Sequence, residues 1–245
     1  MSYLNRYSTP PHPALRLVCF PHAGGSASFF RSWAAHLDPS VELLAVQYPG
    51  RENRFHEPLV PDLATLAEAA AEHLRPLPPL PTVLFGHSMG AAVAYESLLL
   101  LEALGDTPVT RLCVSGRAPD TPPRTTDHTD EQLVEALKEL GGTQAAVLHD
   151  PDLRELLLPI LRNDYHLIDR YRRSPGAPRL RADVLALTGD RDPQLTVEQA
   201  RGWAATTTGG FTLHVLDGDH FYLVPAAAEV ARLTTAVYPN TAGIA

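Results

Sequence analysis

Residues 81–95 read Pro-Thr-Val-Leu-Phe-Gly-His-Ser-Met-Gly-Ala-Ala-Val-Ala-Tyr. An apolar run ends at Gly86, and an alanine-rich segment that favours a helix begins after Gly90. The pattern Gly-x-Ser-x-Gly between two such segments predicts a nucleophile elbow, a sharp strand-to-helix turn that presents Ser88. The two glycines leave space for a strained backbone. The backbone N–H of Met89 then lies at the predicted helix N-terminus, where it can stabilise a developing oxyanion.

Segments typical of strands and of helices alternate along most of the chain. Such alternation favours a parallel sheet whose crossover connections are helices. We therefore expect an α/β fold, with a mostly parallel central sheet flanked by helices, in a single domain over residues 1–245. The expected strands cover residues 15–20, 42–47, 81–85, 111–115, 182–188 and 211–216, and the expected helices cover 28–37, 62–74, 91–104 and 197–205, with a last helix opened by Pro225.

The alternation stops between residues 121 and 179, where no strand-like run occurs. Thr129-Asp-Glu-Gln132 is a capping box that predicts a helix ending at Leu140, and residues 152–171 favour a second helix. Proline-rich boundaries predict that residues 121–179 are a helical lid insertion, mobile without disturbing the core. Its apolar positions are expected to face the sheet or a substrate channel; they are Leu133, Val134, Leu137, Leu140, Leu153, Leu156, Leu157, Ile160, Leu161 and Ile168.

A serine hydroxyl is a weak nucleophile, so Ser88 requires a neighbouring base, and that base requires a carboxylate to orient it. In folds with this elbow, the acid follows a late strand and the histidine lies in the turn after the last strand. Asp192 and His220 occupy these two places. We therefore expect Ser88, Asp192 and His220 to form a catalytic triad.

Asp190 competes with Asp192 for the role of the acid, since both follow the same expected strand. Asp192 stands two residues further from Gly189, which allows the chain to turn the carboxylate toward the histidine loop. Asp190 is more typical of a residue that caps a turn. Glu198 and Asp217 are weaker candidates, because each is typical of a solvated helix start or turn.

A second oxyanion donor is expected in the loop Pro21-His-Ala-Gly-Gly25, which follows the first expected strand. The backbone N–H of Ala23 is the predicted donor, and the glycines allow the backbone to approach a substrate closely. The alternative is that these glycines only shape a tight turn. His22 and His87 flank catalytic positions, and each is expected to pack or to form hydrogen bonds rather than act as the base.

Composition limits the classes of partner and cofactor. The chain carries 20 basic and 28 acidic side chains, a formal charge of -8, which argues against nucleic acid and against membrane binding through a basic tail. No apolar run reaches the ~18 residues that a membrane span requires. Cys19 and Cys113 lie in separate apolar runs, as buried reduced thiols do, which suits a cytoplasmic protein. Cysteines and histidines show no metal-ligand spacing, so we expect neither metal nor cofactor.

Seven motifs along the chain are similar to those of the type II thioesterases that accompany polyketide synthases and nonribosomal peptide synthetases. The resemblance implies an α/β-hydrolase fold and a stand-alone enzyme. It implies hydrolysis, through an acyl-enzyme, of aberrant or stalled acyl groups on the 4'-phosphopantetheine arm of acyl or peptidyl carrier proteins. The motifs are Phe20-Pro-His-Ala-Gly-Gly-Ser26, Tyr48-Pro-Gly-Arg51, Glu57-Pro58, Phe85-Gly-His-Ser-Met-Gly90, Leu140-Gly-Gly-Thr143, Leu161-Arg-Asn-Asp-Tyr165 and Gly189-Asp-Arg-Asp-Pro193.

Two other functions remain open on the same scaffold, a medium-chain chain-terminating thioesterase and a small-molecule esterase, because fold alone does not separate them. A noncatalytic interaction protein is disfavoured by the intact Ser88, Asp192 and His220. We expect a monomer. An arginine cluster could receive the pantetheine phosphate or an acidic carrier surface, although such clusters are usually only solvated. It comprises Arg170, Arg172, Arg173, Arg179 and Arg181.

Overall fold

The computed structural model describes residues 3–105, 107–122, 128–139 and 150–236. In these ranges the strands form one seven-stranded sheet in the order β1-β3-β2-β4-β5-β6-β7, parallel at every pairing except β1 with β3. The predicted α/β class with a mostly parallel sheet is confirmed. The strands are β1 (Leu4–Ser8), β2 (Leu15–Phe20), β3 (Val41–Val46), β4 (Thr82–His87), β5 (Val109–Ser115), β6 (Asp183–Gly189) and β7 (Phe211–Leu216).

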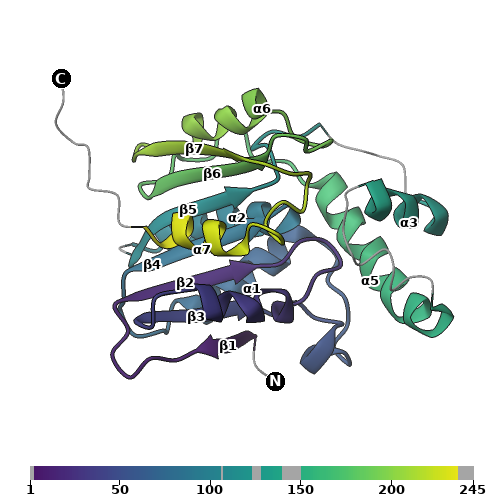
Figure 1. The fold of residues 1–245 in the computed structure, drawn as a ribbon, viewed down its shortest axis with the longest axis horizontal. Helices are drawn as coiled ribbons and strands as arrows, with labels where there is room; N and C mark the ends of the chain where they lie inside the picture. The colour runs from purple at the N-terminus through teal and green to yellow at the C-terminus, as the bar shows by residue number, and fades with distance from the viewer. Residues whose placement is uncertain (1–2, 106, 123–127, 140–149, 237–245) are drawn as a thin grey trace.

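Helices cover both faces of the sheet (Figure 1). The described helices are η1 (Ala27–His36), η2 (Glu52–Arg54), α1 (Leu63–Leu74), α2 (Met89–Ala103), α3 (Asp130–Glu139), α5 (Pro151–Arg170), α6 (Val197–Arg201), η3 (Gly202–Thr206) and α7 (Ala227–Thr235). Helices α1, α2 and part of α5 pack on one apolar cluster, and η1 and α7 pack on the other. None of these helices combines the length and apolar character needed to cross a membrane.

Successive residues of the central strands enter different clusters, because strand side chains alternate between faces. Val18 and Leu84 belong to the α1–α2 side, whereas Cys19 and Phe85 belong to the η1–α7 side. All six residues of β4 are buried, as expected for a strand covered on both faces. Cys19 and Cys113 are both buried and free, as expected from their apolar surroundings.

Some predicted boundaries differ from the structure. The predicted helix over 28–37 is a 3-10 helix, in which residues three apart lie above one another. Phe30 and Trp33 use this spacing to pack edge to face, with ring centroids 5.2 Å apart. The last helix begins at Ala227 rather than at Pro225. Leu140-Gly-Gly-Thr143, and with it the predicted end of the first lid helix, lies outside the described residues.

The elbow at Ser88 joins the central strand β4 to α2. Ser88 has φ 54° and ψ −117°, a conformation that costs energy in a residue with a side chain and is typical of functional sites. A Cβ atom at Gly86 would overlap the carbonyl oxygen of Gly90, and one at Gly90 would overlap that of Phe20. Both glycines are therefore required by close backbone packing around the serine.

We expect Gly86→Ala and Gly90→Ala each to lower the free energy of unfolding by about 2 kcal/mol or more, since the added methyl group meets backbone that cannot rotate away. Gly176→Ala is the matched control, because a Cβ there meets nothing within 4 Å. Urea unfolding followed by circular dichroism measures all three variants. Equal stability of the elbow variants and the control would contradict this account of the turn.

Candidate active site

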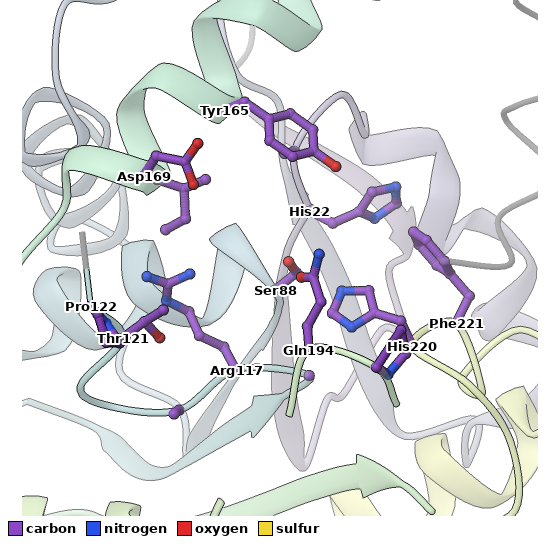
Figure 2. A pocket seen from close by; sticks show the side chains of 15 residues that line it. His22, Ser88, Arg117, Thr121, Pro122, Tyr165, Asp169, Gln194, His220 and Phe221 are labelled. Carbon is purple, nitrogen blue, oxygen red and sulfur yellow. The ribbon is translucent and has the colours of Figure 1, made fainter. Parts of the chain in front are cut away.

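The candidate catalytic residues lie at the carboxyl ends of parallel strands, which meet at one edge of the sheet. Ser88 follows β4, Asp192 follows β6 and His220 follows β7. A cavity of about 250 Å³ opens at this edge, and Ser88 and His220 both line it (Figure 2). Figure 1 shows α3 and α5 at the end of the sheet toward which the arrows of β2 and β5 point. The topology therefore brings the serine and the histidine into one cavity.

Asp192 and His220 form a hydrogen-bonded pair that is excluded from solvent. The distance from His220 Nδ1 to Asp192 Oδ2 is 2.8 Å, and the two side chains are 1% and 0% exposed. The other carboxylate oxygen, Oδ1, accepts a hydrogen bond of 2.9 Å from the backbone N–H of Gln194. A carboxylate held in this way fixes the orientation of the imidazole and leaves Nε2 as the nitrogen able to accept a proton.

The competing carboxylates have other contacts. Asp190 Oδ1 accepts a hydrogen bond of 2.9 Å from the backbone N–H of Gly218, and its Oδ2 lies 3.1 Å from Arg191. Asp217 pairs with the same arginine at 2.6 Å, on the exposed surface. Glu198 stands in the first turn of α6, 3.7 Å from Arg201. The geometry thus gives His220 the partner Asp192.

Met89 and Ala23 are the two expected oxyanion donors. Met89 is the first residue of α2, directly after Ser88, and Ala23 lines the cavity. The neighbouring amides are engaged elsewhere, since Gly24 N–H donates to Asp164 at 2.7 Å and Gly25 N–H donates to the carbonyl of His22 at 2.9 Å. Of this loop, His22 and Ala23 line the cavity, and the amide of Ala23 stays the expected donor.

A buried ion pair that the sequence did not reveal supports this loop. Arg51 binds Asp164 of α5 through both carboxylate oxygens, at 2.6 and 2.9 Å. The same guanidinium donates to the carbonyl of Gly25 at 3.0 Å, while Asp164 accepts from the amide of Gly24. Burial alone would lower the pKa of Arg51, but the adjacent Asp164 raises it overall, so the guanidinium remains charged. Helix α5 and the oxyanion loop are therefore held together.

His22 and His87 pack around the candidate triad rather than form it. His87 Nδ1 lies 2.9 Å from Ser115 Oγ, which lies 2.6 Å from the hydroxyl of Tyr222. The His87 ring is 4.8 Å from that of His220. Burial lowers the pKa of His87 well below its usual value, and the neighbouring His220 and His22 lower it further. His87 is therefore neutral at neutral pH.

We expect Arg51→Met to lower the free energy of unfolding by about 3–5 kcal/mol, because Asp164 would remain buried without its cation. Asp164 is 0% exposed, so water cannot replace the lost partner. Arg162→Met is the matched control on α5, since its ion pair with Asp130 is exposed and worth less than about 1 kcal/mol. Thermal and denaturant unfolding compare the variants. A loss at Arg51 no larger than the loss at Arg162 would exclude the proposed role of the pair.

Known proteins resemble this chain over most of its length. The family described as "Thioesterase domain" matches residues 15–237. The chain is 44% identical to the probable cadicidin biosynthesis thioesterase of Streptomyces griseus, over 98% of this chain and 67% of that protein. It is 40% identical to Thioesterase PikA5 of Streptomyces venezuelae, over 90% and 80%.

Among solved structures, the type II thioesterase BorB from the borrelidin biosynthetic cluster has 42% identity and a TM-score of 0.85, covering 94% of this chain and 95% of that one. The likeness therefore extends over nearly the whole fold and includes the elbow, the sheet and the surrounding helices. The chain belongs to the thioesterase family, hydrolases of thioester bonds with the α/β-hydrolase fold.

Proposed function

We propose that this protein is a stand-alone type II thioesterase that removes aberrant or stalled acyl groups from the 4'-phosphopantetheine arm of acyl or peptidyl carrier proteins. The observation that carries the proposal is the pair of His220 and Asp192 beside the cavity that Ser88 lines. The thioesterase family indicates that the bond hydrolysed is a thioester. The similar protein BorB is a type II thioesterase from a biosynthetic cluster, which supports a role in such a pathway.

In the proposed mechanism, Ser88 Oγ attacks the thioester carbonyl while His220 Nε2 accepts the hydroxyl proton. The N–H groups of Met89 and Ala23 stabilise the oxyanion. The C–S bond then breaks, and His220 returns the proton to the leaving thiolate. His220 then deprotonates a water molecule, which attacks the acyl-serine ester. The carboxylic acid product leaves, and Ser88 is free again with its proton returned by His220. The thiol leaves readily, since alkyl thiols have pKa values near 8.5.

We propose that residues 121–179 act as a lid on this site, within a single domain. Helix α5 contributes Tyr165, Ile168 and Asp169 to the cavity, which supports a covering role. The ion pair at Asp164 fixes the carboxyl-terminal half of α5, so motion is expected before Pro159, which interrupts the hydrogen bonding of the helix. Leu156, before this proline, is 47% exposed and is available to contact an entering chain.

The proposed partner is a carrier protein, bound by a cytoplasmic monomer. Arg172 and Arg173 line a second cavity of about 260 Å³, which shares Thr121 and Pro122 with the active-site cavity. This position suits an arm that reaches Ser88 from outside. Arg173 also pairs with both carboxylate oxygens of Asp120, and Arg172 donates to the carbonyl of Tyr171, so it is their place in the cavity lining that favours these two arginines. The other members of the cluster, Arg170, Arg179 and Arg181, line neither of the two cavities.

We expect Ser88→Ala and His220→Ala each to lower kcat by about 10⁴-fold or more, with the double variant no worse than either, because the residues act as one unit. Asp192→Asn is expected to lose about 10⁴-fold, since the imidazole would lose its orienting carboxylate. Asp190→Asn is the matched control, with a loss below about tenfold. Steady-state hydrolysis of an acyl thioester measures these variants, and similar losses at the two aspartates would show that the acid is wrongly assigned.

We expect the same acyl group to be hydrolysed with about tenfold higher kcat/KM from a carrier protein than from coenzyme A, because carrier contacts add binding energy. Charge reversal at Arg172 and Arg173 should reduce this preference while hydrolysis of a minimal thioester is retained. An oxygen ester completes the panel. Faster hydrolysis of the oxygen ester than of the thioesters would favour the small-molecule esterase, and a preference for medium chains would favour the chain-terminating thioesterase.

A further inference from the structure

Arg117 lines the cavity that Ser88 and His220 also line, although no motif pointed to it. It follows Gly116, which has φ 66° and whose Cβ, if present, would lie 2.6 Å from His87 Cε1 and 3.1 Å from His220 Cε1. The chain therefore passes directly against the two imidazoles before it enters the cavity wall. The carbonyl of Arg117 accepts a hydrogen bond of 2.7 Å from Trp203 Nε1, which fixes the backbone at this point.

The guanidinium of Arg117 lines the cavity on the side away from His220, below Asp169 (Figure 2). It stands 5.7 Å from the centre of the Tyr171 ring. Burial lowers the pKa of Arg117 to about 10, while the nearby Tyr171 and Asp169 raise it, so the group is still a cation at neutral pH.

The groups nearest Arg117 are engaged with other partners. Asp169 Oδ2 lies 2.8 Å from His128 Nε2, and the Tyr171 hydroxyl donates to Glu96 at 2.6 Å. Within the described residues, the guanidinium makes neither an ion pair nor a side-chain hydrogen bond. Arg117 is partly buried, so its guanidinium has donors free to meet a ligand oxygen in the cavity, and a hydrogen bond to a charged group contributes more than one between neutral groups.

The cavity fits a small and oxygen-bearing acyl group. Its volume of about 250 Å³ lies below the roughly 300–1,000 Å³ typical of pockets for drug-sized ligands. Polar side chains, among them Thr121 and Gln194, contribute to its lining. Asp169 also lines the cavity, and its negative charge opposes a carboxylate at the same place.

We propose that Arg117 binds a neutral oxygen of the acyl group, and that the enzyme thereby selects short acyl thioesters with a keto or hydroxyl oxygen near the thioester carbonyl. This inference rests on the proposed thioesterase function and names the class of acyl group. Arg117 is a specificity-determining residue, separate from the triad. An alkyl chain of equal length offers the guanidinium no acceptor, and the expected discrimination is about ten- to a hundredfold.

The test uses four thioesters of one thiol: butyryl, 3-hydroxybutyryl, 3-oxobutyryl and malonyl. The kcat/KM of each is measured for the wild type, for Arg117→Met and for the control Arg162→Met. For each variant, the kcat/KM of each oxygenated substrate is divided by that of the butyryl thioester. Comparison of this ratio between variants cancels the intrinsic reactivity of the substrates. We expect Arg117→Met to lower the 3-hydroxy and 3-oxo ratios about ten- to a hundredfold, while Arg162→Met changes no ratio.

Equal losses on all substrates would overturn the proposal, because they would make Arg117 only structural. A malonyl ratio that falls more than the 3-hydroxy and 3-oxo ratios would also overturn it, since the site would then select a carboxylate. If the Met variant does not fold, Arg117→Lys replaces it; its ammonium lacks the planar fork, so an unchanged ratio would contradict the proposal. A wild-type protein that hydrolyses none of the thioesters would instead refute the proposed function.

Discussion

The buried ion pair between Arg51 and Asp164 joins segments 113 residues apart in the chain. Through it, the loop after β3, the oxyanion loop after β2 and helix α5 become one unit, because Gly24 and Gly25 bond to the same two side chains. A surface ion pair could not enforce this arrangement, since water would compete for both charges. The shape of the active-site cavity, to which α5 contributes three residues, depends on that buried contact.

The central strands of the sheet were predictable, because each has a sequence pattern typical of a buried strand. Strands buried on both faces are continuous apolar runs, and β4 is such a run bounded by a proline and a glycine. The edge strand β1 was not predicted. It pairs antiparallel with β3, and of its residues only Leu4 is buried, so its sequence carries little pattern. The 3-10 geometry of η1 was missed because helical periodicity over ten residues does not distinguish the two helix types.

At the candidate site, sequence motifs identified the residues that are marked by their immediate neighbours in the chain. Ser88 is marked by its own glycines, and His220 and Asp192 by the turns that follow strands; the structure brings the last two into contact. Arg51 and Asp164 each lie in one of the seven motifs, but the motifs do not indicate that the two side chains pair across 113 residues. Arg117 lies in none of the motifs, because its role depends on the cavity. The neutral state of His87 likewise follows from three-dimensional burial, which no spacing in the sequence reports.

The three proposed catalytic residues follow strands that lie at different places in the sheet. The serine stands on the central strand β4, whereas the acid and the base follow β6 and β7, the two strands at one edge. Strand β7 is only partly buried, and edge elements of this kind open at lower free energy than a central strand. Opening of that edge separates the base from the serine while the elbow and most of the core persist. During synthesis, the proposed base His220 follows β7, so the proposed triad cannot be complete before that strand has been made.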